Sequence, residues 1–214
     1  MIVKILGRII TTAFIGLTAL STAQATPLIF TNITMEVKSS SYQVTGGDNA
    51  TSLLAAFNSG SSLCSLNLAD FTGVGGPQNC ALSKRNLATL YTVDYFFDGT
   101  GSALFELGAD WGRGGIVIGA DGGDIVRTDD IWWARSWNNA DVIDFTISGS
   151  GYGTFQLLGF EGCCSGYNSL RYSVDSGQFF SAVRAVVEPA PLALLGLSLG
   201  AFGVMANRKR PKKA

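Results

Sequence analysis

The sequence lacks histidine altogether, and only 14% of its residues are charged. Without histidine the chain has neither the commonest general base nor the imidazole that zinc sites often use. Its four cysteines form no Cys-x-x-Cys pair, and the chain contains no Gly-x-Ser-x-Gly nucleophile motif and no internal repeat. These absences argue against zinc binding and against serine hydrolase chemistry. We therefore expect a protein that uses no cofactor and is not an enzyme.

Long apolar runs are also scarce, and the first of them lies at the N-terminus. Lys4 and Arg8 precede an apolar run over residues 9–20, which Ala23-Gln24-Ala25 follows as a small-residue cleavage site. As a helix these twelve residues would extend about 18 Å, short of the roughly 30 Å hydrocarbon core of a membrane. We predict that residues 1–25 form a signal peptide that is removed, with an uncleaved membrane anchor as the alternative.

The second apolar run lies near the C-terminus and is followed by a basic cluster. Residues 190–207 would extend about 27 Å as a helix, a short but sufficient membrane span. Positive charges come directly after it, carried by Arg208, Lys209, Arg210, Lys212 and Lys213. Because clustered lysine and arginine stay on the cytoplasmic side, the segment predicts a transmembrane helix with all preceding residues outside.

A short proline-containing element precedes this helix and completes a known pattern. It reads Val-Val-Glu-Pro-Ala-Pro, and its prolines keep the peptide extended. The segment 186–214 resembles a PEP-CTERM sorting domain. Glu188 and Pro189 match the end of the Pro-Glu-Pro motif of that family, and Arg208 to Arg210 match its basic end. Val187 stands where the family has its first proline.

The resemblance implies a sorting route rather than a lasting anchor. Proteins of this kind are held in the inner membrane until an exosortase, a membrane protease, cleaves them near the motif. We therefore expect an exosortase as partner, the inner membrane as a transient location, and the cell surface or extracellular matrix as the destination, in contact with exopolysaccharide. An ordinary single-span membrane anchor is the alternative.

The segment between the two ends, residues 26–185, has the length of one domain. From Thr26 to Val187 there are eight lysine or arginine residues against fifteen aspartate or glutamate residues, a net charge of −7. Such an acidic surface repels phosphate groups, so nucleic acid is not an expected partner.

Alternating apolar and polar residues dominate this segment, as expected for half-buried strands. The alternation is clearest over residues 33–38 and 91–98, and Asp175-Ser176-Gly177 reads as a hairpin turn. Only residues 51–58 read as a helix, and the loop 59–78 is the least regular stretch. We predict an all-β fold, a single jelly-roll-like β-sandwich between the signal peptide and the sorting helix. Further strands are expected over residues 103–107, 115–118, 131–137, 142–147, 153–160, 170–174 and 178–183.

Export makes disulfides the default state of the four cysteines. A bond between Cys64 and Cys80 would close a loop rich in glycine, asparagine and proline, leaving Cys163 and Cys164 bonded to each other or free. A crossed arrangement that ties this loop to Cys163 is the alternative. The run Cys-Cys-Ser-Gly from Cys163 resembles a Cys-Cys-x-Gly signature of some PEP-CTERM proteins. With no adjacent basic residue to favour a thiolate, we expect a structural turn there rather than a redox site.

Tryptophans are the strongest candidates for ligand contact. Trp132, Trp133 and Trp137 lie in one predicted strand, where exposed indoles would stack on sugar rings. Trp133 and Trp137 would share one face and Trp132 the other, so one set must belong to the core. The acidic residues at 121–124 and 129–130 could ligate calcium, but their spacing fits no standard calcium loop and favours a solvated turn.

The sequence thus predicts an exported surface or extracellular-matrix protein with a non-catalytic structural or carbohydrate-contacting module. Two alternatives stay open. One is a carbohydrate-active enzyme with paired carboxylates, drawn from Asp129, Asp130, Asp141 and Asp144. The other is a passive coat protein, which an aromatic groove of sugar size would argue against.

Overall fold

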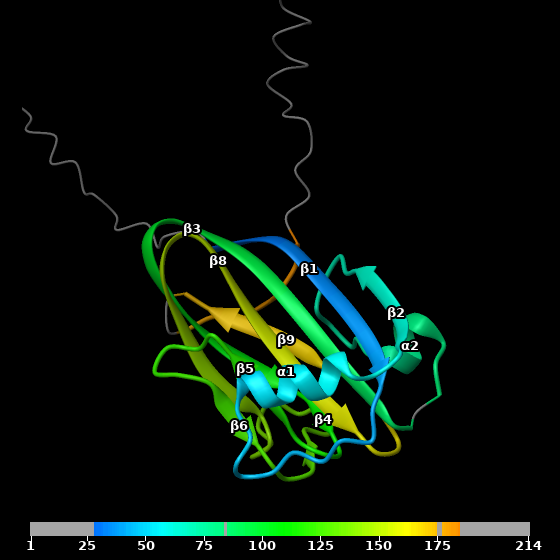
Figure 1. The fold of residues 1–214 in the computed structure, drawn as a ribbon. Helices are drawn as coiled ribbons and strands as arrows, with labels where there is room; N and C mark the ends of the chain where they lie inside the picture. Colours follow the sequence, from blue (N-terminus) through cyan, green and yellow to red (C-terminus); the bar gives the residue numbers. More distant parts are fainter. Residues whose placement is uncertain (1–27, 84, 175–176, 185–214) are drawn as a thin grey trace, which may run out of the picture.

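The computed structural model describes residues 28–83, 85–174 and 177–184 (Figure 1). The predicted signal peptide (residues 1–25) and the predicted sorting segment (residues 186–214) lie outside these ranges. Within the described ranges, no helix is long and apolar enough to cross a membrane.

Antiparallel strands make up most of the described chain, and two short helices accompany them. In chain order the elements are β1 (Leu28–Ser39), α1 (Ala50–Asn58), β2 (Ser62–Asn67), α2 (Gly76–Cys80), β3 (Leu87–Gly108), β4 (Asp110–Trp111), β5 (Gly115–Ile118), β6 (Ile125–Arg127), β7 (Ile131–Trp132), β8 (Ile143–Glu161), β9 (Ser169–Ser173) and β10 (Phe180–Ser181). The all-β prediction is confirmed.

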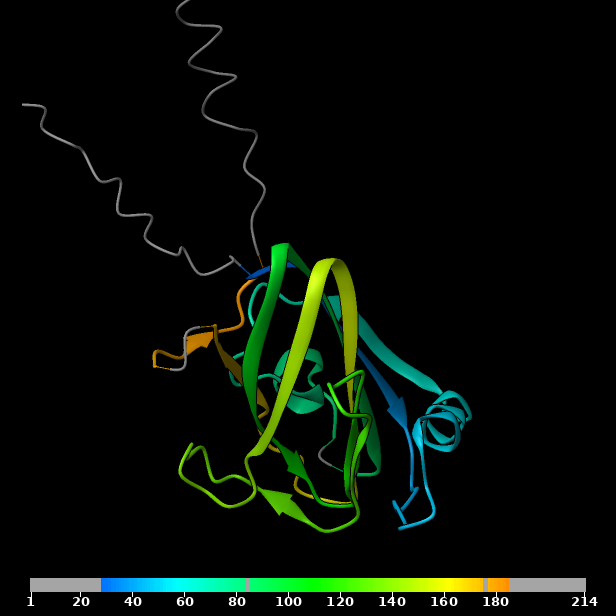
Figure 2. The same ribbon diagram turned by 90° about the vertical axis from the view of Figure 1, so that its left-hand side faces the viewer.

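Two long strands, β3 and β8, run through both layers of a β-sandwich. They pair with each other along almost their whole length, apart from a register break between Phe97 and Gly101. Near that break both strands turn back at one end of the molecule, so that their two halves lie in opposite layers (Figure 2). Gly99 and Gly151 have φ values of 97° and 73° at this bend, a backbone region that glycine adopts without a Cβ clash.

Each layer takes one half of both long strands. The first layer has the order β2-β1-β3-β8-β5-β6 and uses residues 87–97 of β3 and 151–161 of β8. The second layer has the order β10-β9-β3-β8 and uses residues 101–108 and 143–149. Because the long strands are continuous through the bend, the two layers are linked by backbone as well as by packing.

Aromatic side chains fill the space between the two layers. The Phe105 ring centroid lies 5.1 Å from those of both Phe145 and Phe155, and Phe30 meets Phe105 edge-on at 6.2 Å. All four residues are buried. Burying a side chain of this size stabilises the fold by about 1.5–3 kcal/mol, so this cluster is a large part of the core.

Helix α1 covers the outer face of the first layer (Figure 1). Asn49 is its N-cap: the Asn49 side chain accepts a bond from the Ser52 N–H, and the Ser52 hydroxyl accepts one from the Asn49 N–H. Leu53 and Phe57, four residues apart on one helix face, are buried against the outward side chains of β8. The helix predicted over residues 51–58 is confirmed.

Most predicted strands are present, although several are joined or extended. Residues 91–98 and 103–107, expected as separate strands, belong to β3, and residues 142–147 and 153–160 belong to β8. Both strands bend at glycines and continue, still paired with each other, into the second layer. Alternation in the sequence does not reveal this continuity. The loop 59–78, expected to be irregular, contains β2 and the start of α2. Strands β9 and β10 pair antiparallel as the predicted hairpin requires.

Candidate functional site

The short ribbon of β4 and β7 places one acidic and one aromatic side chain next to each other. Asp110 of β4 lies directly opposite Trp132 of β7, and Trp111 lies opposite Ile131. Directly opposite residues of an antiparallel pair project to the same face of the ribbon. Because Trp111 and Ile131 are buried in the core, Asp110 and Trp132 share the outward face.

The Trp111 indole fixes this ribbon against the first layer. It lies over Gly115 and Gly159, which are paired between β5 and β8. A Cβ atom added at Gly115 would come within 2.4 Å of the indole, and one added at Gly159 within 2.1 Å. No side chain fits at either position without displacing the tryptophan. The absence of side chains at these two glycines therefore allows the Trp111 indole to pack there, which sets the position of β4.

Trp132 is held through its backbone and exposes its side chain. Its N–H donates to Asp141 Oδ2 at 3.1 Å, and its carbonyl accepts a bond from Asn139 Nδ2 at 3.2 Å. The residue is nevertheless 64% exposed. An aromatic side chain on a fixed backbone loses little conformational entropy when a ligand packs on it.

Glu161, the last residue of β8, is a buried carboxyl group beside the ribbon. It is 4% exposed, and its Oε2 and Oε1 accept bonds from the N–H groups of Gly112 (3.0 Å) and Cys163 (3.1 Å). The pKa of Glu161 is raised to about 7, because burial, together with the charge on Asp110, outweighs the opposing effect of the backbone donors. A Cβ atom at Gly112 would lie 2.5 Å from Oε1, so this approach requires glycine.

Asp110 is also fixed by a hydrogen bond and by a glycine that lies close to its carboxylate. Its N–H donates to Asn168 Oδ1 at 3.1 Å, and a Cβ atom added at Gly166 would lie 1.7 Å from its Oδ2. Burial and, to a smaller extent, the charge on Asp130 together raise the pKa of Asp110 to about 6. Near neutral pH Asp110 is mostly ionised and Glu161 is partly protonated, so the two carboxyl groups together can accept and donate hydrogen bonds.

These groups line one cavity of about 740 Å³, within the range of about 300–1,000 Å³ that is usual for small-molecule sites. Asp110, Asp130 and Glu161 supply carboxyl groups, and Trp132 supplies an apolar surface. Arg113 adds a guanidinium group whose Nη1 is buried and has no hydrogen-bond partner in the described part of the chain. The lining is completed by Gln43, Gly112, Gly162, Cys163 and Cys164.

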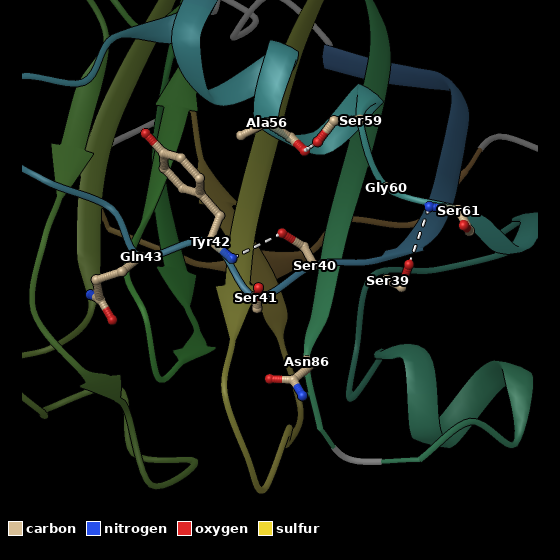
Figure 3. Close-up of a pocket in the computed structure, with 10 residues that line it drawn as sticks. All are labelled: Ser39, Ser40, Ser41, Tyr42, Gln43, Ala56, Ser59, Gly60, Ser61 and Asn86. Carbon is tan, nitrogen blue, oxygen red and sulfur yellow. Dashed lines mark hydrogen bonds between the residues drawn. The ribbon is translucent and has the colours of Figure 1, made fainter.

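A second cavity of about 670 Å³ adjoins the first at Gln43, which lines both. Figure 3 shows it between residues 39–43, the C-terminal end of α1 and Asn86. Every residue in its lining is uncharged. Part of its polar surface serves the fold, because Ser39 Oγ accepts a bond from the Ser61 N–H at 3.1 Å. The second cavity therefore adds a neutral, hydroxyl-rich surface next to the first.

Strand β7 ends at Trp132, so the strand predicted over residues 131–137 is wrong. Ala134 and Arg135 adopt positive φ values of 53° and 57°, which turns the chain and stops the alternation of faces. Two successive residues in this region are rare outside turns. The three tryptophans consequently do not form one strand.

Trp133 and Trp137 lie against each other, and neither lines the cavity of Trp132. Their ring centroids are 4.8 Å apart. Trp133 is buried and its Nε1 donates to the Tyr167 carbonyl at 2.8 Å, whereas the Arg171 guanidinium lies 4.4 Å from the Trp137 ring. Of the three candidate tryptophans, only Trp132 faces the cavity.

Most of the acidic residues that the sequence offered as calcium ligands or as a catalytic pair have other partners. Asp121 and Asp124 each accept a backbone N–H bond at 3.1 Å, and Asp129 pairs with Arg127 at 2.9 Å. Of those acidic residues, Asp130 lines the cavity. Within residues 28–83, 85–174 and 177–184, no three acidic or cysteine side chains lie close enough together to hold a metal ion.

The cysteines follow the favoured pairing. Cys64 and Cys80 form a disulfide that links β2 to α2, which contradicts the crossed arrangement. Cys163 and Cys164 are unbonded and exposed, with their Sγ atoms 2.8 Å apart. The pair lies in the wall of the cavity beside Glu161.

Asp110 and Glu161 were not among the candidates that the sequence offered. One signal was available for Glu161, because a lone acidic residue ends the apolar run of β8 and is followed by glycine. A charged residue at the end of a buried strand needs a polar partner, which makes it a candidate for a polar site. Asp110 offered no comparable signal, because its place depends on the partner strand β7.

Comparison with protein-family models gave no match, and comparison with curated proteins gave none. Among solved structures, the chain is similar to the PA14 domain of the antifreeze protein MpAFP, with a TM-score of 0.47 and 12% identity over 73% of this chain and 89% of that one. It is also similar to the epithelial adhesin 9 A domain from Candida glabrata in complex with Galβ1-3GlcNAc, with a TM-score of 0.45 and 9% identity over 75% and 93% of the two chains. A third similar structure is a PA14 sugar-binding domain from an RTX adhesin, with a TM-score of 0.44 and 8% identity over 72% and 99%. Because each TM-score lies below 0.5, we base the function of this chain on its own residues.

Proposed function

We propose that the chain is an exported, non-catalytic surface module that binds a saccharide in the cavity beside Trp132. The observation that carries this proposal is the pairing of Asp110 with the exposed Trp132 on one ribbon face, over a cavity of about 740 Å³. An aromatic surface next to a few fixed polar groups is the usual composition of a small-molecule site.

The chemistry of the lining suits a neutral sugar. The apolar face of a sugar ring can pack on the Trp132 indole, where its C–H groups meet the negative face of the ring system. Its hydroxyl groups can donate to Asp110 and Asp130 and accept a bond from Arg113. Because three carboxyl groups line the cavity against one guanidinium, an acidic saccharide would be repelled.

The cavity lies at the end of the molecule opposite the described chain ends, which suits a module that is tethered through those ends. The first described residue, Leu28, pairs with Phe97 at the bend, and Arg184 bridges to Phe30 beside it. The cavity lies at Glu161, ten residues of β8 away from Gly151, or about 34 Å along a strand. In Figure 1 the described chain ends lie at the top with this bend, whereas β4 lies near the bottom. A chain held near its described ends would present the cavity outward.

A binding experiment with matched variants tests the saccharide site. The exported protein would be titrated against an array of neutral and acidic oligosaccharides, followed by calorimetry on those that it retains. Trp132→Ala should weaken binding about tenfold or more, as expected for an aromatic anchor. Tyr152→Ala is the control, because Tyr152 is an 82% exposed aromatic residue that lies beside Phe96 at the bend, away from the cavity. Equal affinity of wild type and Trp132→Ala, or no retention of any saccharide, would contradict the proposal.

We further propose that the C-terminal segment 186–214 sorts the protein through an exosortase to the cell surface or extracellular matrix, where exopolysaccharide is the expected ligand. The support is the order of Glu188-Pro189, apolar run and basic end in the sequence. The intact mass of the exported protein should correspond to a chain that starts at Thr26 and lacks the basic end. A Glu188→Ala/Pro189→Ala double variant should remain in the membrane at precursor mass, whereas Val187→Ala should mature normally. Normal maturation of the double variant would favour a plain anchor.

One observation favours a second candidate function, hydrolysis of a glycosidic bond. Asp110, Asp130 and Glu161 line one cavity, and Glu161 has the raised pKa that a general acid needs. Against it, both Glu161 oxygens already accept backbone N–H bonds, which keeps this carboxyl group in a structural role. Release of nitrophenol from nitrophenyl glycosides, abolished by Asp130→Asn, would establish the enzyme; no release would leave the binding module.

A further inference from the structure

Cys163 and Cys164 form a pair of exposed, adjacent thiols in the wall of the cavity. Their Sγ atoms are 2.8 Å apart, less than 1 Å beyond the roughly 2.05 Å of a disulfide bond. Cys164 has a φ of 68°, a backbone region that a residue with a Cβ atom adopts at a cost of about 1 kcal/mol or more. The turn thus holds the two side chains on the same side of the backbone.

The chain offers this pair no other cysteine as partner. The sequence has four cysteines, and the bond between Cys64 and Cys80 uses the other two. In an oxidising compartment two accessible thiols that are already in contact do not stay reduced for long. Oxidation would therefore join Cys163 and Cys164 to each other in a disulfide bond.

We propose that Cys163 and Cys164 form a vicinal disulfide in the exported protein, and that the resulting small ring is a rigid wall of the saccharide cavity. The existence of the bond rests on the geometry of the turn alone. Its part in ligand binding rests on the proposed function.

The bond forms by thiol–disulfide exchange with a low-molecular-weight disulfide, for which oxidised glutathione is the probe. One cysteine thiolate attacks a glutathione sulfur and releases one glutathione thiolate, which leaves a mixed disulfide. The neighbouring thiolate attacks the protein sulfur of that mixed disulfide and releases the second glutathione. The two cysteines lose two protons and two electrons in total, and one molecule of oxidised glutathione becomes two of reduced glutathione.

The ring would act on the cavity through Glu161. The Cys163 N–H donates to Glu161 Oε1 at 3.1 Å, so a fixed Cys163 backbone fixes one end of that carboxyl group. The hydrogen bond with Cys164 raises the pKa of the Cys163 thiol, which favours a lasting structural bond over an exchange catalyst. A disulfide also presents sulfur and methylene groups without thiol protons, which adds apolar surface on the wall that the Trp132 indole shares.

Tryptic digestion separates the two cysteine pairs cleanly. Residues 136–171 carry Cys163 and Cys164 as their only cysteines, and residues 39–84 carry Cys64 and Cys80. After incubation of the exported protein with oxidised glutathione and alkylation of free thiols, peptide 136–171 should lack any alkyl group and weigh two hydrogen atoms less than its reduced form. Alkylation of both its cysteines, or two stable glutathione adducts, would overturn the assignment of the bond.

The role in the cavity is tested separately with a Cys163→Ser/Cys164→Ser double variant. Its urea unfolding midpoint and its Cys64–Cys80 bond show whether it folds, and a calorimetric titration measures its affinity for the saccharide that wild type binds. We expect binding about three- to tenfold weaker than that of the oxidised wild type, because a preorganised wall is lost. Equal affinity would overturn the role of the ring. If oxidised wild type binds no saccharide, both the proposed function and the role of the ring in binding are wrong. The mass of peptide 136–171 still shows, independently, whether the Cys163–Cys164 bond forms.

Discussion

Replacement of Glu161 by glutamine tests the electrostatics of the cavity without removing a large side chain. The carboxyl group is 4% exposed and accepts backbone bonds from Gly112 and Cys163. An amide presents one acceptor oxygen and one NH₂ group, so Glu161→Gln must turn a donor toward one of these two N–H groups. The lost hydrogen bond should reduce the free energy of unfolding by about 1–3 kcal/mol at low pH, where the Glu161 carboxyl group of wild type is neutral in both states.

The pH dependence carries the sharper prediction. Burial raises the pKa of Glu161 from 4.5 to about 7, so between these values the folded protein keeps a proton that the unfolded chain releases. Stability from this group is therefore fully present below pH 4.5 and is lost as pH rises through about 7. At 1.36 kcal/mol per pH unit, the loss across this window of about 2.5 units is at most about 3.4 kcal/mol. Asp110, with its pKa raised to about 6, acts in the same direction at lower pH.

Urea titrations of wild type and Glu161→Gln between about pH 5 and pH 8 would measure both effects, since the midpoint and slope give the free energy of unfolding at each pH. The wild-type free energy should fall as pH rises, and the variant should show a smaller fall. The difference between the two proteins should shrink toward pH 8, where the buried charge of wild type is itself destabilising. Parallel curves would refute our account, because they would mean that Glu161 has the same pKa in both states.

Three other predictions follow from single contacts. Gly166→Ala should lower the urea midpoint and the affinity for saccharide together, because its Cβ atom would lie 1.7 Å from Asp110 Oδ2; an unchanged midpoint would contradict this contact. Cys64→Ser/Cys80→Ser should reduce the free energy of unfolding by about 3 kcal/mol, the entropy of opening a loop with a sequence separation of 16; calorimetric unfolding would measure it. Gln43→Ala should weaken longer oligosaccharides more than monosaccharides, because Gln43 lines both cavities; equal effects in calorimetric titrations would argue against a continuous groove.

Alternation in the sequence predicted the strands well because each layer buries one face. Tyr91 and Val93, with Thr92 between them, alternate in burial as the sequence indicated. The same alternation could not show that β3 continues past Gly99 into the second layer, because a glycine bend reads like a turn in the sequence. It also missed β2, whose side chains are mostly exposed and whose position depends on pairing with β1 and on the Cys64–Cys80 bond.

The cavity was harder to predict than the fold because long-range register creates it. Trp132 was a candidate on its chemistry alone, but nothing near it in the sequence says that Asp110 will lie opposite. Gly112 and Glu161 are 49 residues apart and meet because β4 packs on the end of β8. The raised pKa of Glu161 follows from that burial and from the nearby Asp110, so it could not be inferred before the strands were placed. A lone tryptophan in a sequence is thus weak evidence for a ligand site, whereas an exposed tryptophan that lines a cavity together with fixed carboxyl groups has the composition of a small-molecule site.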